Sequence, residues 1–171
     1  MKPLFLVGYM GCGKSTLGRK TARRLDVEFA DTDALLEQRE GASAADVYQL
    51  AGEEYFRRAE RAVLDELIDS SRCLVVSTGG GLPTWSDNMA RMNAAGTTVY
   101  LRRSVEQIAR RLSPYGRQKR PRLRGLADDE LVDFMRRDMA DREPFYAQAQ
   151  LTVDCVNRTD AELVEWIMQH C

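Results

Sequence analysis

The segment Leu4-Phe5-Leu6-Val7-Gly8-Tyr9-Met10-Gly11-Cys12-Gly13-Lys14-Ser15 decides the fold of this chain. It begins with an apolar run, Leu4–Gly8, of the kind that forms a buried strand. A complete GxxxxGK[ST] motif then extends to Ser15. After it, side chains suited to burial recur on one helical face at Leu17, Thr21, Ala22 and Leu25. A strand, a glycine-rich loop and a helix in this order predict a phosphate-binding loop, because backbone amides and the helix N-terminus attract phosphate oxygens.

The residues of this loop predict how a nucleoside triphosphate and Mg²⁺ are bound. We expect Lys14 to reach the β- and γ-phosphates and the Ser15 hydroxyl to coordinate Mg²⁺. The candidate phosphate-binding residues are Gly11, Cys12, Gly13, Lys14, Ser15 and Thr16. The alternative is a glycine-rich turn that only packs a helix on a strand. Cys12 also has two interpretations: a reactive thiol, if it faces the amides and solvent, or a small residue that the loop tolerates.

The rest of the chain repeats the alternation of strand and helix. Further apolar runs that resemble strands are Val27–Ala30, Leu74–Thr78, Thr97–Leu101 and Leu151–Asp154. Helical periodicity separates them, as at Phe56, Ala59, Val63 and Leu67, and a capping box of Ser104 and Gln107 precedes a helix over Val105–Leu112. Apolar strands that alternate with helices predict a parallel sheet covered on both faces. We therefore expect one three-layer α/β/α domain over residues 1–171, with ligands beyond the carboxyl ends of the strands.

Composition and charge exclude several classes of protein. The 171 residues include 25 basic and 26 acidic ones, whereas proteins that coat nucleic acid or anionic membranes usually carry a basic surplus. No apolar run approaches the ~18 residues that a membrane span requires. The 4 cysteines form no CxxC pair and His170 is the 1 histidine, which disfavours a zinc site or a histidine-based triad. We expect a cytoplasmic protein with neither nucleic acid nor a membrane as partner.

Two carboxylates, Asp31 and Asp33, follow the second candidate strand. Because one residue separates them, they project differently, so that one can face Mg²⁺ and its water while the other orients a substrate hydroxyl and accepts its proton. The alternative is a solvated turn with an aspartate N-cap on the next helix. Beside a phosphate-binding loop, the functional interpretation is favoured.

Glycines and arginines follow the later strands. Gly79-Gly80-Gly81 permits close approach of a ligand or of another backbone segment, although a tight turn explains it equally well. One of the adjacent Arg57 and Arg58 is expected to emerge at the edge of the sheet. Arg142 precedes Pro144, where we expect a helix to stop, and a bidentate guanidinium there can grip a carboxylate or phosphate.

A basic stretch lies between Arg110 and Arg124 and contains no acidic residue. Its turn-forming residues predict that no helix crosses it: Pro114, Gly116, Pro121 and Gly125. The stretch is a nucleic-acid patch, a solvated face or a mobile lid that closes on anionic ligands. The phosphate-binding loop and the balanced net charge favour a lid, at approximately residues 113–125.

Taken together, the motifs resemble those of the shikimate kinase family. In chain order they are GYMGCGKSTLGR, DTD, GEEYFRRAE, STGGG, RQKRPRL and DREPFY, and the resemblance covers essentially all 171 residues. It implies Mg²⁺-dependent transfer of the ATP γ-phosphate to the 3-hydroxyl of shikimate, giving shikimate 3-phosphate, on the route to chorismate and the aromatic amino acids. It also implies a P-loop kinase fold with strand order 2-3-1-4-5, a mobile lid and an acceptor-binding region at approximately residues 32–60. We expect a monomer.

The resemblance further implies roles for single residues on the acceptor side. Asp33 would contact the shikimate hydroxyls and act in catalysis. Arg57 and Arg142 would bind the carboxylate of shikimate. Gly79, Gly80 and Gly81 would approach its ring and hydroxyls.

On the nucleotide side, the resemblance implies that Lys14 and the lid residue Arg120 reach the phosphates. Asp31 would hold Mg²⁺ through water. Arg110 and the loop that contains Arg158 would flank the adenine. This last loop departs from the family pattern, because it lacks the proline that many members have there, and which of its residues contacts the base stays open.

Other functions compete with this interpretation. Another kinase of the same fold, acting on a nucleoside monophosphate or gluconate, also needs arginines and a phosphate-binding loop, but Asp33, Arg57, Gly80 and Arg142 together favour a polyhydroxylated carboxylate. A GTPase-like switch needs NKxD and DxxG motifs, and the chain contains neither. A nucleic-acid-binding module depends only on the basic stretch and is opposed by the net charge of −1.

Overall fold

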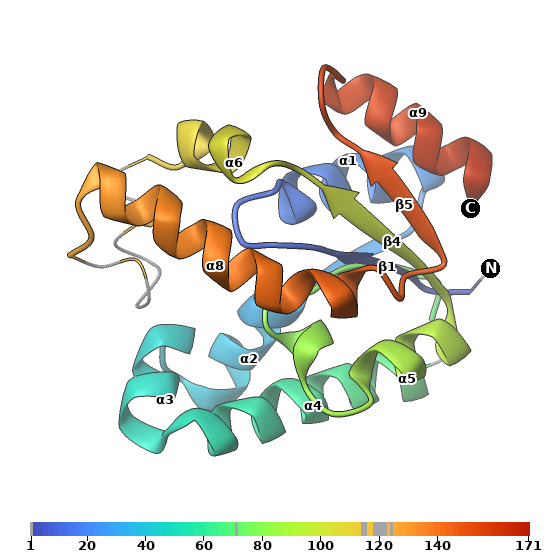
Figure 1. Ribbon diagram of the computed structural model, residues 1–171. Coiled ribbons are helices and arrows are strands. Elements are labelled where there is room, and N and C mark those ends of the chain that lie inside the picture. The colour runs from blue at the N-terminus through green and yellow to red at the C-terminus, as the bar shows by residue number, and fades with distance from the viewer. Residues whose placement is uncertain (1, 71, 114–115, 118–122, 124) are drawn as a thin grey trace.

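The structure is a computed structural model, and it describes residues 2–70, 72–113, 116–117, 123 and 125–171 (Figure 1). The strands are β1 (Leu4–Val7), β2 (Glu28–Asp31), β3 (Leu74–Ser77), β4 (Thr97–Arg102) and β5 (Leu151–Asp154). The helices are α1 (Lys14–Leu25), α2 (Thr32–Glu40), α3 (Ala44–Ala51), α4 (Glu53–Asp69), the 3₁₀ turn η1 (Leu82–Thr84), α5 (Asn88–Ala95), α6 (Val105–Arg111), α8 (Asp128–Tyr146) and α9 (Asp160–His170). The predicted strands are confirmed, each within one residue at either end.

The strands form one parallel sheet in the order β2-β3-β1-β4-β5, which confirms the predicted topology. β1 lies at the centre, where Phe5 pairs with Val76 of β3 and with Thr98 of β4. Its position explains why Phe5 and Leu6 are fully buried. The edge strands β2 and β5 are only partly buried, so the expectation that the sheet is covered on both faces does not hold for all of their residues, because an edge strand has one neighbour and less cover.

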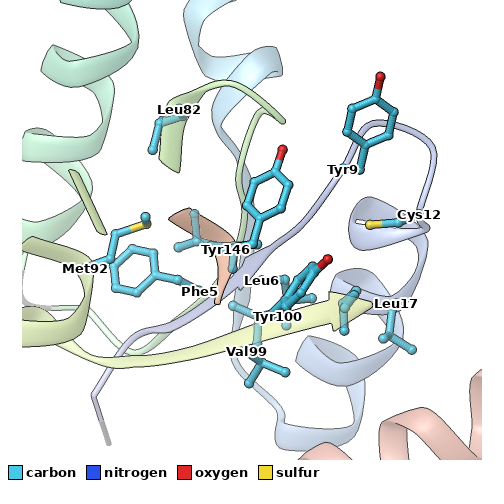
Figure 2. Packing of buried hydrophobic residues seen from close by; sticks show 14 of the residues in the cluster. Phe5, Leu6, Tyr9, Cys12, Leu17, Leu82, Met92, Val99, Tyr100 and Tyr146 are labelled. Carbon is cyan, nitrogen blue, oxygen red and sulfur yellow. The ribbon is translucent and has the colours of Figure 1, made fainter. Parts of the chain in front are cut away.

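Helices cover both faces of the sheet, which confirms three layers (Figure 1). α1 and α9 pack together on one face, while α4, α5 and α8 lie toward the other. Successive side chains of β1 point to opposite faces of the sheet. Phe5 lies near Met92 of α5 (Figure 2), and Leu6 faces α1, because its Cδ1 would lie 3.4 Å from a Cβ at Gly18. None of the helices in the described part of the chain combines the length and apolar composition that crossing a bilayer demands.

One expectation about a helix end is wrong. α8 does not stop before Pro144 but continues to Tyr146, with Pro144 in its last turn. The proline removes one backbone donor, and the loss is offset by Tyr146, which is fully buried and donates from its hydroxyl to the Gly80 carbonyl at 2.6 Å. Within the basic stretch, the described residues Gly116 and Arg117 are helical, and the Ser113 Oγ and carbonyl accept hydrogen bonds from their backbone N–H groups. The prediction that no helix crosses the stretch falls mostly on residues outside the described ones.

Candidate functional site

A cleft of about 540 Å³ lies at the carboxyl ends of the strands. Because parallel strands end at the same edge, this is where the loops after β1, β2 and β3 meet. The predicted site residues that line the cleft are Gly11, Gly13, Lys14, Ser15, Thr16, Asp31, Asp33, Arg57, Gly80, Gly81 and Arg142. The fold therefore gathers most of the sequence-predicted residues around one space.

The phosphate-binding loop turns from β1 into α1 through a left-handed glycine. Gly13 is the N-cap of α1, with a φ of 104° that glycine adopts without the strain of other residues. The helix that it starts begins at Lys14, so the free backbone N–H groups of the first turn face the cleft. This geometry suits an anionic ligand, because the helix N-terminus carries partial positive charge.

Lys14 is folded onto its own loop. Its Nζ donates to the carbonyls of Gly8 at 2.8 Å and Tyr9 at 2.9 Å, and the side chain is nearly buried. Cys12 is 1% exposed and belongs to the buried core cluster, so its thiol does not face solvent, and its Sγ lies 3.8 Å from Lys14 Nζ. The structure therefore favours the interpretation of Cys12 as a small residue that the loop tolerates.

Three oxygen-bearing side chains meet beside the loop. Ser15 Oγ donates to Asp31 Oδ2 at 2.6 Å and lies 3.1 Å from Ser77 Oγ. Asp31 ends β2 and Ser77 ends β3, and the two residues are paired in the sheet. The other oxygen of Asp31 caps α2 by accepting from the N–H groups of Asp33 and Ala34. Asp31 is thus the N-cap of α2, the alternative interpretation, while its second oxygen faces Ser15 of the phosphate-binding loop.

The chemistry of this oxygen set fits Mg²⁺. Mg²⁺ prefers hard oxygen ligands and is usually held by one or two carboxylates together with substrate phosphates and water. Among the described residues, no cluster of His, Cys, Asp and Glu side chains is large enough to hold a metal ion by itself. Ser15 and Asp31 therefore fit a cation that arrives with a phosphate ligand, and do not fit a resident metal centre.

At one end of the cleft, Asp33 of α2 and Arg57 of α4 face the glycines after β3. We call this part the acceptor end, because the family resemblance implies that the phosphate acceptor binds there. A Cβ at Gly79 would lie 3.0 Å from Glu60 Oε1 and would collide with Asp33 Oδ1, so the absence of a side chain lets both carboxylates approach. A Cβ at Gly81 would likewise collide with the guanidinium of Arg57. The space next to Gly79 and Gly81 is thus occupied by side chains of the protein, and both glycines also accept backbone hydrogen bonds in the turn that leads into η1.

Arg57 is paired with a buried carboxylate that the sequence did not reveal. Arg57 Nη1 lies 2.6 Å from Glu60 Oε2, and Glu60 is 2% exposed. Burial raises the pKa of Glu60 to about 7, against the opposing attraction of Arg57. Arg57 emerges toward the cleft, whereas its neighbour Arg58 is exposed and pairs with Glu54. This answers which of the two adjacent arginines reaches the site.

Arg142 enters the cleft from α8 and is mostly buried. Its Nη1 would lie 3.6 Å from a Cβ at Gly80, which places the guanidinium over the glycine segment. Asp138, one turn earlier, lies 3.2 Å from Arg142 Nε, and Tyr9 donates to the other oxygen of Asp138. Both arginines of the predicted carboxylate clamp thus face the same part of the cleft, each with an acidic partner behind it.

Some predicted residues are not brought to the cleft surface. Cys12 and Gly79 lie behind it, and Arg110 and Arg158 are exposed and do not line it in the described part of the chain. Arg111, one residue further along α6, does line the cleft, and a Cβ at Gly13 would lie 3.6 Å from its Nη2.

The predicted lid is described only in part. Arg120 and most of residues 113–125 lie outside the described residues. Of those that are described, Ser113 and Gly116 line the cleft.

Several cleft residues were missed by sequence reasoning, notably Glu60, Ser77, Tyr48 and Arg111. Glu60 could have been found, because it is one helical turn from Arg57 and a carboxylate at that spacing pairs with a guanidinium. Ser77 follows from the pairing of β2 with β3, which a single sequence does not display.

A parallel sheet of this order, a phosphate-binding loop and an acceptor end with carboxylates and arginines define the class of P-loop small-molecule kinases. The sequence model of one family within this class, shikimate kinase, matches residues 10–171. The shikimate kinase of Parabacteroides distasonis is 44% identical over 154 residues, which are 90% of this chain and 88% of that protein. That of Bacteroides thetaiotaomicron is 41% identical over 169 residues, 99% of this chain and 95% of that protein. The chain belongs to the shikimate kinase family.

Solved structures agree with this assignment. A crystal structure of shikimate kinase from Bacteroides thetaiotaomicron matches with a TM-score of 0.91 at 38% identity, covering 99% of this chain and 97% of the other. Shikimate kinase from Acinetobacter baumannii in complex with shikimate matches with a TM-score of 0.87 at 33% identity, covering 99% and 92%. A gluconokinase from Sinorhizobium meliloti has a TM-score of 0.56 at 18% identity, covering 96% and 87%, and this likeness shows the shared fold alone.

Proposed function

We propose that this protein phosphorylates the 3-hydroxyl of shikimate with the γ-phosphate of ATP. The observation that carries the proposal is the presence, in one cleft, of a phosphate-binding loop, the carboxylate Asp33 and the two arginines Arg57 and Arg142. A polyhydroxylated carboxylate needs cations for its carboxylate and an acceptor for its hydroxyl proton. Shikimate has both groups, whereas a nucleoside monophosphate has no carboxylate.

Asp33 is the proposed proton acceptor. It is the second residue of α2, two positions after the capping residue Asp31, and it is exposed to the cleft and lies next to Gly79. A carboxylate in this position can orient the attacking hydroxyl and take its proton as the phosphoryl group is transferred. Arg57 and Arg142 hold the acceptor by its carboxylate and so fix which hydroxyl faces the nucleotide.

On the nucleotide side, the amides of Gly11–Thr16 bind the phosphates and Lys14 exchanges its present carbonyl partners for phosphate oxygens. Arg120 is proposed to add a second cation from the lid. Ser15 and, through water, Asp31 hold Mg²⁺, which when bound neutralises charge on the phosphates. For the adenine, Arg111 joins Arg110 and Arg158 as a candidate, because it is the one that lines the cleft in the described residues.

The remaining proposals concern the whole chain. Residues 1–171 act as one kinase domain, in which the region of residues 32–60 supplies the acceptor-binding side chains Asp33 and Arg57 and residues 113–125 form the lid. The protein works as a monomer in the cytoplasm. Its 4 cysteines are all unpaired, which fits a reducing compartment.

The test is an ADP-release assay with shikimate, gluconate and AMP offered separately to the purified protein. Shikimate is expected to be the preferred acceptor, and phosphorus NMR of the product is expected to place the phosphate on the 3-hydroxyl. A Lys14→Met variant controls for contaminating kinases, since loss of charge stabilisation of this kind costs about 10²–10³-fold in kcat. A higher kcat/KM with gluconate or AMP would overturn the proposal in favour of another kinase of this fold.

A further inference from the structure

Arg142 is held by a buried carboxylate on its own helix. Asp138 Oδ1 lies 3.2 Å from Arg142 Nε, and only 7% and 11% of the two side chains are exposed. Burying such a pair is unfavourable unless good geometry and further hydrogen bonds satisfy the remaining polar atoms. The hydrogen bond that satisfies the second oxygen of Asp138 therefore bears on the role of the pair.

That second oxygen accepts a hydrogen bond from Tyr9, in the phosphate-binding loop. The Tyr9 hydroxyl donates to Asp138 Oδ2 at 2.7 Å, across 129 positions of sequence. The guanidinium carbon of Arg142 lies 5.8 Å from the centre of the Tyr9 ring, so the ring also packs against the arginine. Figure 1 shows α8 passing alongside the loop after β1, and Figure 2 shows the Tyr9 side chain projecting from that loop.

The backbone and the side chain of Tyr9 belong to different ends of the site. Its carbonyl accepts from Lys14 Nζ at 2.9 Å, which is part of the phosphate-binding loop. Its side chain is 1% exposed, so within the described structure it has almost no surface to offer a nucleotide. The hydroxyl instead reaches the carboxylate behind Arg142.

We propose that Tyr9 and Asp138 are positioning residues for the acceptor. The Tyr9 hydroxyl fixes the Asp138 carboxylate, and Asp138 binds Nε of Arg142, so that the terminal nitrogens of the guanidinium point to the glycine floor of the cleft, near Gly80. This inference rests on the proposed function. It gives the side chain of Tyr9, in the phosphate-binding loop, a role in the affinity for shikimate.

The first variant is Tyr9→Phe, which removes one oxygen and keeps the buried ring. It is expected to raise the KM for shikimate about three- to tenfold, the size of one net hydrogen bond, with the KM for ATP unchanged. Tyr55→Phe is the matched control, because Tyr55 also donates to a carboxylate, Glu40, at 2.8 Å but is exposed and lies outside the cleft. It is expected to leave both constants unchanged.

Two further measurements test whether the effect passes through Arg142. Asp138→Ala removes the ion-pair partner of Arg142 Nε and is expected to raise the KM for shikimate about tenfold, whereas Asp138→Asn keeps an oxygen there and is expected to restore most of the loss. In an Arg142→Ala background, Tyr9→Phe is expected to have no further effect, because residues that act as one unit are not additive.

The outcomes separate the inference from the proposed function. If the unsubstituted protein does not phosphorylate shikimate, the proposed function fails before any variant is made. If it does, and Tyr9→Phe leaves the KM for shikimate unchanged or raises the KM for ATP instead, only the positioning role is wrong. An equal effect of Tyr9→Phe with and without Arg142 also overturns it. Should Asp138→Ala fail to fold, Tyr9→Phe alone decides.

Discussion

At the scale of single residues, the acceptor end contrasts two carboxylates that share one glycine neighbour. Asp33 is exposed to the cleft, whereas Glu60 is 2% exposed and lies behind Arg57. A Cβ at Gly79 would touch both of them, so they are close enough for their charges to interact. Environment therefore divides the roles: the exposed carboxylate can meet the acceptor, and the buried one holds the arginine.

The role of Asp33 is tested by Asp33→Asn. The amide keeps the size of the side chain and still forms hydrogen bonds, but it does not take up the proton of the acceptor hydroxyl. Loss of a general base typically lowers kcat by about 10²–10⁴-fold, with the affinity for ATP retained. Steady-state kinetics and calorimetric titration with ATP measure the two effects. A variant that retains most of its kcat would show that Asp33 only positions the acceptor or has neither role.

The buried state of Glu60 predicts a pH dependence of stability. Its pKa is about 7 in the folded protein, above the usual 4.5, so between these values the folded chain holds a proton that the unfolded chain has lost. The free energy of unfolding therefore falls as pH rises from 4.5 to 7, by about 3 kcal/mol over the full window. Urea unfolding at several pH values is expected to show a flatter profile for Glu60→Gln.

The control for this experiment is Glu66→Gln on the same helix. The Glu66 side chain is 70% exposed and is paired only at the surface, with Arg39. It is expected to leave the slope between pH 4.5 and 7 as it is in the unsubstituted protein. Parallel profiles for the protein and its Glu60→Gln variant would contradict the assignment of a raised pKa to Glu60.

At the scale of elements, the glycine segment after β3 shapes the acceptor end because its residues carry no side chains. Gly81 precedes η1 with a φ of −92°, which any residue adopts, so its backbone does not demand glycine. The space does, because a Cβ would collide with the Arg57 guanidinium. The position of Arg57 therefore depends on an element that is distant in sequence.

Gly81→Ala is expected to displace Arg57 and raise the KM for shikimate about tenfold or more, the effect of a weakened charged hydrogen bond, with little change in the KM for ATP. Gly41→Ala is the control. Gly41 ends α2 in the left-handed region, with a φ of 66° and nothing within 4 Å of an added Cβ, so alanine there strains the backbone without touching the site. It is expected to lower the melting temperature and leave both KM values unchanged. Equal kinetics in the two variants would contradict the role of Gly81.

The elements also show what sequence patterns can and cannot predict. The strands were predictable because apolar runs between helical segments have few other interpretations, and β1 and its loop carried the strongest pattern. The end of α8 was not, because the local preference against helix before Pro144 is overridden by the burial of Tyr146, a tertiary contact. The same limit applied to β2 and β5, whose exposure depends on their place at the sheet edges.

The candidate site divides in the same way. The phosphate-binding loop, Asp31, Asp33, Arg57 and Arg142 were predictable, since each is part of a contiguous motif and lies at the cleft. The partners behind them were not: Asp138 depends on the phase of α8 and on the approach of Tyr9 from another element. Helical phase also decides that Arg111 rather than Arg110 lines the cleft, because successive residues of a helix point about 100° apart.

At the scale of the whole molecule, buried tyrosines connect the site to the stability of the core. Tyr9 lies in the loop after β1, Tyr100 in β4 and Tyr146 in α8, and each is at most 3% exposed. The rings of Tyr100 and Tyr146 lie 5.4 Å apart (Figure 2). Burial, the largest cause in each case, raises the pKa of all three hydroxyls well above the usual value of 10.

These tyrosines predict steep unfolding at alkaline pH. Above pH 10 the unfolded chain loses tyrosine protons that the folded chain keeps, so the free energy of unfolding falls by up to about 1.4 kcal/mol per pH unit for each tyrosine. Denaturant titrations between pH 9 and 11, with tyrosinate absorbance recorded in parallel, measure both quantities. Tyr100→Phe is expected to reduce the slope by the contribution of one tyrosine. Ionisation of all tyrosines of the folded protein near pH 10, without unfolding, would contradict the prediction. It would show that burial of these hydroxyls does not couple their ionisation to unfolding.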